Sequence, residues 1–176
     1  MPVSEGNVLV RPATADDIPV IGAFAGELYT LHHTWDPVRF WDLGAGTPGR
    51  QTGRERFFHS LLSDATVVLL VAEQDARPVG YAFAGFESHD YENLLEEAIW
   101  VHDLYVIPEA RGGVTADRLL ATAAERGRAA GCPLLVLTVA ESNTRAQAFF
   151  ARRGARVTMR EMTIDLRAPA ADEPQR

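Results

Sequence analysis

The apolar residues of this chain follow two periods, and the change from one to the other separates helices from strands. Between residues 18 and 31 they recur every three or four positions, which predicts an amphipathic helix whose first turn follows the capping residue Thr14. The stripe consists of Ile18, Ile21, Phe24, Ala25, Leu28 and Leu31. Similar spacing predicts further helices at about residues 54–63, 115–130 and 143–153.

Alternating or uninterrupted apolar runs of strand length predict strands over residues 7–12, 66–73, 79–86, 98–106, 134–139 and 159–166. The pair Arg77-Pro78 is expected to form the turn of an antiparallel hairpin. The helix over 115–130 joins two strands that should run parallel, through a right-handed crossover. The pattern predicts an α/β fold with a single mixed, mostly antiparallel sheet and helices on both faces.

Three stretches lack either period and are expected to be connections. Residues 31–42 are rich in aromatic side chains, residues 44–53 in glycine and proline, and residues 90–97 in acidic groups. There is no internal repeat and no second domain boundary in the sequence, so residues 1–166 are expected to form one domain. Residues 167–176 combine proline, alanine and charged residues and are expected to be a loose tail.

The composition narrows the classes of partner. The chain has 24 acidic and 17 basic residues, so its formal net charge is −7. This charge argues against a nucleic-acid partner and would attract cations such as amines, although solubility alone accounts for it. Cys132 is the single cysteine, which excludes an intrachain disulfide and favours a reducing, cytoplasmic setting. No run in the sequence has the length of a membrane helix or the pattern of a secretory signal, and no metal-ligand spacing is present.

Candidate chemistry is concentrated in DLYVIPEARGGVTADRLL, residues 103–120. Pro108 ends a strand because it has no N–H to donate, and Gly112 and Gly113 permit a tight turn before a helix. A helix that follows such a turn presents unpaired N–H groups and the positive end of its dipole, which bind phosphate, and Arg111 adds a planar charged donor. The alternative is a plain strand-turn-helix connection.

Three segments carry a family resemblance when they are taken in order. They are VRPATADD near the start, HDLYVIPEARGG in the middle and NTRAQAFFARRGA near the end. They resemble the first strand and helix, the pyrophosphate loop and the late helix of the GNAT superfamily of N-acetyltransferases, over Val8 to Leu166. The resemblance implies the GNAT acyl-CoA N-acyltransferase fold with a splayed parallel strand pair. It also implies acetyl-CoA as co-substrate without a metal, and a homodimer is a further expectation from the family.

The resemblance places acetyl-CoA in the split between the two parallel strands. It implies that the pantetheine arm follows the backbone of Leu104, Tyr105 and Val106, and that the pyrophosphate meets Arg111, Gly112, Gly113, Val114, Thr115 and Ala116. Asn143 would contact the pantetheine arm and Phe150 would border the thiol. An asparagine at this position can equally cap a helix.

The chain departs from the family pattern at two positions. Val114 stands where the loop has its inner glycine, and a Cβ there would crowd the phosphate or exclude a positive φ. Phe150 replaces a tyrosine that protonates the leaving thiolate in many members; Tyr105 and Tyr91 are candidate stand-ins, and a thiolate is itself a fair leaving group. The departures leave an alternative open: a GNAT-fold domain that binds CoA weakly or not at all and serves in sensing or interaction.

The resemblance also implies direct transfer to a primary amine, which needs a base and an oxyanion donor near Val106. His102 stands where related members carry a glutamate, and histidine titrates near neutral pH; Asp103 and Glu97 are the other candidates. Strand alternation puts His102 and Asp103 on opposite faces unless a β-bulge intervenes.

The acceptor pocket is expected at His32, His33, Trp35 and Asp36, where aromatic rings and an acid suit a cationic amine. Trp35, Phe40 and Trp41 can equally pack the loop against the core. A polyamine, an aminoglycoside, an amino-acid derivative and a protein N-terminus all remain open as acceptors.

Overall fold

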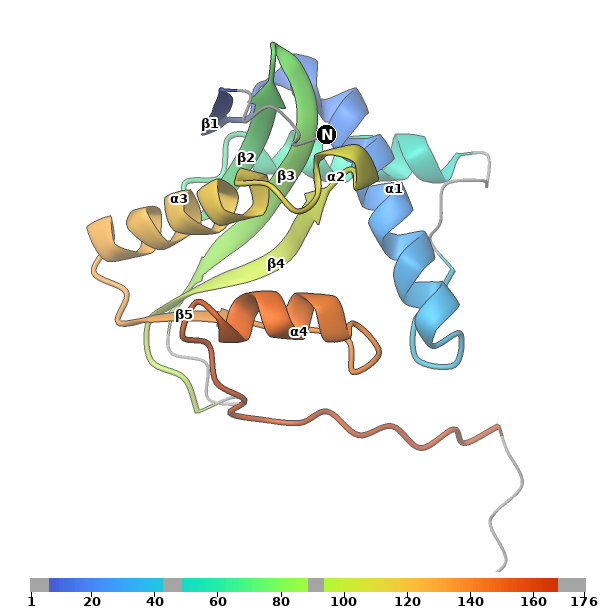
Figure 1. The fold of residues 1–176 in the computed structure, drawn as a ribbon. Helices are drawn as coiled ribbons and strands as arrows, with labels where there is room; N and C mark the ends of the chain where they lie inside the picture. The colour runs from blue at the N-terminus through green and yellow to red at the C-terminus, as the bar shows by residue number, and fades with distance from the viewer. Residues whose placement is uncertain (1–6, 43–48, 89–93, 168–176) are drawn as a thin grey trace, which may run out of the picture.

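The computed structural model describes residues 7–42, 49–88 and 94–167. The elements along these segments are β1 (Val8–Pro12), η1 (Ala15–Asp17), α1 (Ile18–Trp35), α2 (Arg50–Leu61), β2 (Val67–Gln74), β3 (Arg77–Glu87), β4 (Ala98–Val106), η2 (Pro108–Ala110), α3 (Thr115–Ala129), β5 (Leu134–Leu137) and α4 (Thr144–Ala151). The strands form one sheet in the order β1-β2-β3-β4-β5. All neighbours are antiparallel except β4 and β5, which run parallel. The predicted fold class is confirmed (Figure 1).

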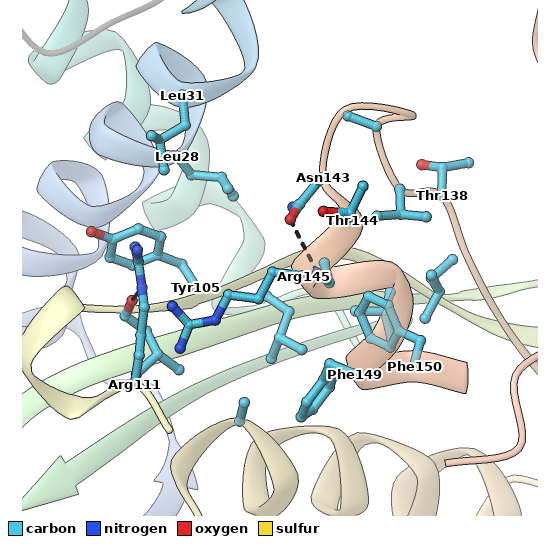
Figure 2. A pocket seen from close by; sticks show the side chains of 18 of the residues that line it. Leu28, Leu31, Tyr105, Arg111, Thr138, Asn143, Thr144, Arg145, Phe149 and Phe150 are labelled. Atoms are coloured by element: carbon cyan, nitrogen blue, oxygen red, sulfur yellow. Dashed lines mark hydrogen bonds between the residues drawn. The ribbon is translucent and has the colours of Figure 1, made fainter. Parts of the chain in front are cut away.

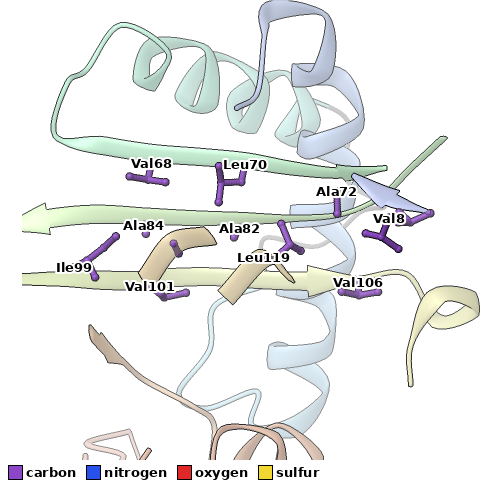
Figure 3. Close-up of a cluster of buried hydrophobic side chains, with 12 residues drawn as sticks. Val8, Val68, Leu70, Ala72, Ala82, Ala84, Ile99, Val101, Val106 and Leu119 are labelled. Atoms are coloured by element: carbon purple, nitrogen blue, oxygen red, sulfur yellow. The ribbon is translucent and has the colours of Figure 1, made fainter. Parts of the chain in front are cut away.

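Helices cover both faces of the sheet, and each face has its own apolar core. On one face, Leu119 of α3 joins a buried cluster with Leu70 and Ile99 from the strands (Figure 3). On the other face α1 and α2 pack, and Phe58 of α2 is fully buried with its ring against that of Tyr81. Strands β2 and β3 are covered on both sides, which explains why their sequences are almost uninterrupted apolar runs.

The hairpin between β2 and β3 turns two residues earlier than predicted. Asp75 and Ala76 both have positive φ, 51° and 59°, as in a tight two-residue hairpin turn. Arg77 and Pro78 are already the first residues of β3. The predicted Arg77-Pro78 turn is therefore wrong, because a proline is tolerated at the start of a strand and marks that start here.

Helix α1 continues to Trp35 and takes in the first part of the connection expected over residues 31–42. The sequence breaks the helix only at Pro37, whose ring disfavours helical backbone in the preceding residue. Asp36 is accordingly extended, and its carboxylate accepts hydrogen bonds of 3.0 Å from the backbone N–H groups two and three residues later. Most of the expected acceptor residues therefore stand on a helix and not on a loop.

The start of α1 is held by an ion pair that joins three elements. Arg11 of β1 donates to both carboxylate oxygens of Asp17, at 2.7 and 2.8 Å, and its Nε donates to Glu73 of β2 at 3.1 Å. The backbone N–H of Thr14 also donates to Asp17, at 2.7 Å. The hydrogen bonds from Arg11 hold the pKa of Asp17 at about 2, below its usual value of 3.8.

The strand predicted over residues 159–166 is not formed. In the part of the chain that the structure describes, residues 155–165 belong to neither a helix nor a strand and extend past α4 (Figure 1). The alternating apolar side chains are Val157, Met159, Met162, Ile164 and Leu166, and each is 70% exposed or more. Alternation alone cannot form a strand, because a strand also needs a neighbour to pair with. Tyr91, residues 43–48 and the expected tail beyond Arg167 lie outside the described residues.

Candidate functional site

Strands β4 and β5 pair over a short length and then separate. Their register runs from Ala98 opposite Leu134 to Val101 opposite Leu137, where β5 ends while β4 continues to Val106. The predicted splay between the two parallel strands is confirmed. Beyond the last paired residues lies a cavity of about 550 Å³.

The walls of the cavity come from α1, β4, the turn after β4, the start of α3, and α4 with the segment before it (Figure 2). The residues predicted for the cofactor that line it are Leu104, Tyr105, Val106, Arg111, Gly112, Gly113, Ala116, Asn143 and Phe150. His102, His32 and Trp35 from the predicted base and acceptor sets also line it. The predicted residues outside its lining are Val114, Thr115, Asp103, Glu97, His33 and Asp36.

The turn between β4 and α3 has its left-handed residue at Gly112, where φ is 87°. Val114, in contrast, has φ −85° and ψ −4° and is the N-cap of α3. The loop therefore needs no positive φ at this position, and its backbone conformation accepts a β-branched residue. The first intrahelical hydrogen bond runs from Arg118 N–H to Val114 O at 2.9 Å, so the amides of residues 115–117 have no acceptor within the helix.

Positive charge gathers around the cavity although the whole chain is acidic. Its lining includes Asp117 as the single carboxylate, together with the arginines Arg111, Arg145, Arg152 and Arg153. Arg153 forms an ion pair with Asp117, and Arg145 projects from α4 into the space between α4 and Arg111 (Figure 2). Of these arginines, only Arg111 was predicted from the sequence. The signal for the other three is their spacing, because residues seven and eight positions apart share one side of a helix.

Arg111 is anchored to the end of β4. Its Nε donates to the carbonyl oxygen of Val106 at 2.8 Å, and its guanidinium lies over the ring of Tyr105, 5.5 Å from the centroid. Ile107 N–H donates to Val79 O on β3 at 2.9 Å. Successive residues of a strand direct their amide groups to alternate sides, so those of Val106 point away from β3 and towards the split.

Tyr105 does not present its hydroxyl as a free donor. The side chain is buried, and its hydroxyl donates to the carboxylate of Glu27 on α1. Burial, and then the hydrogen bond to Glu27, raise the pKa of Tyr105 to about 12. The phenol is thus neutral at physiological pH and its proton is directed at Glu27.

A β-bulge changes which side chains near the end of β4 lie on the same face of the sheet. Phe83 of β3 pairs with Asp103, and the next residue of β3 pairs with Val101, so His102 has no partner. The ring of His102 lies 4.8 Å from that of Phe83, and Asp103 accepts a hydrogen bond of 2.8 Å from Tyr81. Phe83 and Tyr81 are two residues apart and share a face. His102 and Asp103 therefore lie on the same face, and the opposite orientation expected from alternation is wrong.

The two side chains differ in their surroundings. The carboxylate of Asp103 accepts from the hydroxyls of Tyr81 and Tyr29, at 2.8 and 3.3 Å, and burial raises its pKa above the usual value. The side chain of His102 is 37% exposed, with Nε2 3.6 Å from a carboxylate oxygen of Glu87. Glu97 is exposed just before β4, at the end of the strand that is paired with β5, and the structure does not bring it to the cavity.

The predicted acceptor residues divide into two groups. His32 and Trp35 line the cavity, and the ring of His32 contacts those of Trp35 and Phe40 with centroids 5.1 and 4.9 Å apart. His33 Nδ1 bonds to the backbone oxygen of Phe40 at 2.8 Å, and Asp36 caps the turn after α1. These contacts hold His33 and Asp36 against the segment that follows α1, outside the lining of the cavity.

Helix α4 supplies the remaining wall. Asn143 is its N-cap, and its side-chain oxygen accepts from Ala146 N–H at 3.1 Å (Figure 2). The amide nitrogen of Asn143 stays available, so capping and ligand binding are compatible. Phe150 lines the cavity and packs edge-on against Phe149. Among the described residues there is no group of three or more His, Cys, Asp and Glu side chains that could hold a metal, and no helix of these segments could cross a membrane.

A match to a known protein family shows which family this chain belongs to. The model of the Acetyltransferase (GNAT) family matches residues 29–155. The chain belongs to the GNAT acetyltransferase family. The match includes the splayed end of β4, the glycine turn and α4, so the predicted family is confirmed, while the motif VRPATADD lies before the matched residues.

Several solved structures share the fold at low sequence identity. A mutant of the BH1408 protein from Bacillus halodurans is 19% identical with a TM-score of 0.78, covering 90% of this chain and 99% of its own. A predicted acetyltransferase with acetyl-CoA from Clostridium acetobutylicum is 15% identical with a TM-score of 0.66, covering 94% and 100%. Aminoglycoside N-acetyltransferase AAC(6')-Iy in complex with a CoA bisubstrate analog is 19% identical with a TM-score of 0.67, covering 90% and 97%.

Proposed function

We propose that this protein is an N-acetyltransferase that transfers the acetyl group of acetyl-CoA directly to a primary amine of a small, cationic acceptor. The observation that carries the proposal is the cavity at the splayed end of β4 and β5, which combines open strand amides, a helix N-terminus and four arginines. An extended polyanionic ligand needs these features together: backbone groups for its pantetheine arm and positive charge for its phosphates.

The cofactor residues would act as follows. The N–H and C=O groups of Leu104 would pair with the pantetheine arm, and the pyrophosphate would meet the amides at the start of α3. Arg145 and Arg152 would neutralise phosphate charge from the side of α4. Asn143 would use its free amide nitrogen, and Phe150 would pack beside the thioester.

The transfer step needs a neutral amine. Its nitrogen attacks the thioester carbonyl carbon, an oxyanion forms, and the C–S bond breaks to leave the CoA thiolate. The N–H of Val106, directed into the split, would stabilise the oxyanion. Because Phe150 has no proton and Tyr105 donates to Glu27, we assign protonation of the thiolate to water.

His102 is the proposed base, because it lines the cavity while Asp103 lies behind it. His32 and Trp35 would form the near wall of the acceptor site, with α1 contributing the aromatic surface for a cation. AAC(6')-Iy, with an aminoglycoside-derived bisubstrate analog, supports an amine acceptor as a class. We expect a cytoplasmic enzyme that needs neither metal, nucleic acid nor membrane as partner.

Calorimetric titration with acetyl-CoA tests the proposal directly, and Arg145 is the residue to change. Arg145→Ala should weaken acetyl-CoA binding about tenfold or more, because it removes a charge-assisted contact from an exposed side chain. Arg128→Ala makes the same change of charge at the far end of α3, outside the cavity, and should leave the affinity unchanged. Equal effects of both substitutions would show only a general charge effect, and absent binding would reject the proposal.

A GNAT-fold domain that binds CoA without catalysis is the second candidate, and Phe150 is the observation that favours it. The two candidates separate in one assay, which follows release of free CoA thiol in the presence of polyamine, aminoglycoside, amino-acid and peptide amines. Binding of acetyl-CoA with no release above the rate in buffer would favour the second candidate.

A further inference from the structure

A cationic acceptor is best held by a carboxylate, and the described residues that line the cavity include only one. That carboxylate is Asp117, which forms an ion pair with Arg153. Asp36, which the sequence predicted for this role, caps the turn after α1 outside the lining. Asp103 is enclosed, accepts from two tyrosine hydroxyls and has a pKa raised by burial, so it is a poor partner for a cation. The charge that would hold an ammonium group must therefore come from outside this lining.

Glu87, at the end of β3, supplies an open carboxylate beside the proposed base. Its Oε1 lies 3.6 Å from His102 Nε2, and the two side chains are 43% and 37% exposed. Both polar atoms converge above Gly85, because a Cβ there would lie 3.3 Å from Glu87 Oε1 and 3.4 Å from His102 Nε2. Since glycine has no side chain, the carboxylate and the imidazole can both approach the sheet at this point. A cation that reaches this point would meet both groups.

Aromatic rings flank the pair of Glu87 and His102. The ring of Phe83 lies 4.8 Å from that of His102 and 5.9 Å from that of Phe57 on α2. The indole of Trp100 is nearly parallel to the imidazole, with an interplanar angle of 11° and centroids 6.4 Å apart. Phe83 and Trp100 are half-buried and Phe57 is 46% exposed, so part of this ring surface is open to solvent. Rings beside a carboxylate suit an ammonium group whose carbon body is itself apolar.

We propose that Glu87 binds the acceptor as an ammonium ion, with the apolar or aromatic body of the acceptor against Phe83 and Trp100. This inference rests on the proposed function and names the class of acceptor, a primary amine with one positive charge. A polyamine or an aminoglycoside carries several positive charges, which one open carboxylate among the described residues of this site does not match. Glu87 adds the negative charge that the wall formed by His32 and Trp35 lacks.

The contact between Glu87 and His102 also accounts for the path of the proton. The ammonium N–H bond breaks, the proton forms a bond with His102 Nε2, and the lone pair stays on the amine nitrogen for attack on the thioester. The proton that leaves this nitrogen as the amide forms passes through water to the CoA thiolate. The imidazolium then lies 3.6 Å from the carboxylate of Glu87, which stabilises its charge until the proton passes to solvent.

Amine binding followed by NMR titration tests the site independently of catalysis. The probes are 2-phenylethylamine, which is charged near neutral pH, and 2-phenylethanol, its neutral counterpart. The wild type should bind the charged probe about tenfold more tightly, and Glu87→Gln should remove most of this difference. Glu96→Gln makes the same change of charge at an exposed carboxylate before β4 and should keep the difference. Absent binding, or a difference that Glu87→Gln keeps or Glu96→Gln equally removes, overturns the inference.

The ring surface is tested by shortening the body of the probe. 2-Phenylethylamine should bind more tightly than ethylamine, and Trp100→Leu should reduce that advantage about threefold or more. Trp41→Leu changes a tryptophan that is 75% exposed after α1 and should leave the advantage unchanged. An undiminished advantage in Trp100→Leu would overturn the assignment of the apolar body.

Release of CoA thiol from acetyl-CoA in the presence of 2-phenylethylamine separates this inference from the proposed function. Glu87→Gln should raise KM for the amine about tenfold and leave the calorimetric affinity for acetyl-CoA unchanged. Amine binding without release would reject the proposed transfer and keep the site. Release with an unchanged KM in Glu87→Gln would keep the transfer and reject the site.

Discussion

At the scale of single residues, the unpaired position of His102 decides which side chains near the end of β4 lie beside the cavity. In a regular strand only one of His102 and Asp103 could face α1 and α2. The bulge turns both to that face, with an exposed imidazole beside the cavity and an enclosed carboxyl group held by two phenols. If His102 is the base, as proposed above, the neighbouring carboxyl group of Asp103 would stabilise the charge that it acquires.

Paired pH–rate profiles should therefore separate the roles of the two residues. If His102 is the base, kcat/KM of the wild type rises with pH through one limb, and His102→Gln loses that limb and roughly 10²–10⁴-fold in rate. Asp103→Asn should keep the limb and lower the rate less. The raised pKa of Asp103 means that it becomes a base only above its ordinary titration range. Loss of the limb in Asp103→Asn with its survival in His102→Gln would transfer the role to Asp103.

Asp17 gives a prediction about stability. Its pKa is about 2 in the folded protein and 3.8 ordinarily, so its contribution is present above pH 4 and is lost as pH falls towards 2. The shift corresponds to about 2 kcal/mol. The side chain of Asp17 is 7% exposed and that of Arg11 is 31% exposed, so solvent screens the pair in part and about 2 kcal/mol is an upper limit. Denaturant unfolding at pH 6 should show Asp17→Asn destabilised by up to this amount, and the difference should vanish near pH 2. Asp16→Asn, an exposed neighbour, serves as control and should behave like the wild type throughout.

At the scale of elements, the turn between β4 and α3 makes a specific demand on one of its two glycines. Gly112→Ala should lower the free energy of unfolding by about 1–2 kcal/mol, because φ of 87° strains any residue with a Cβ. Gly113 has no positive φ, and a Cβ there would meet only Ala110 O at 3.9 Å. Gly113→Ala should therefore be close to neutral in thermal or denaturant unfolding. Similar losses at both positions would show that the turn needs glycine for space and not for its dihedral angle.

The elements also show how far the sequence could predict the fold. The four α-helices and the first five strands were predictable, because the sequence repeats the apolar period of each. The two short 3-10 helices were not predicted, and α2 begins at Arg50, four residues earlier than expected. The end of α1 was misplaced, since the helix continues to Trp35 and Pro37 excludes helical backbone only from Asp36. The hairpin turn was misplaced because Pro78 lies at the start of β3 and not in the turn. The sixth predicted strand failed for a different reason. Its pattern is correct for a strand, but pairing depends on a neighbour that the local sequence does not contain.

At the scale of the molecule, the charge around the cavity is opposite in sign to the net charge of the chain. A chain with a net charge of −7 gathers four arginines around one cavity, and three of them come from the neighbourhood of α4. The motif around Arg111 was recognisable in the sequence because turn chemistry is local. The contribution of Arg145, Arg152 and Arg153 was not, since it depends on how α4 is placed across the split. The bulge at His102 could not be predicted either. Each strand taken alone alternates regularly, and the mismatch in register arises only where β3 and β4 pair.

Helix α4 has an energetic consequence for the whole protein. All of its residues are described, and none of them is buried, although it forms one wall of the cavity. A helix of eight residues has little stability of its own in water. A ligand in the cavity would supply the missing contacts, so part of the binding free energy would be spent on ordering the helix. Association should then show a favourable enthalpy opposed by entropy, with a negative heat-capacity change larger than a rigid cavity would give. Ligand affinity and the folding of the last helix are, on this view, a single coupled equilibrium.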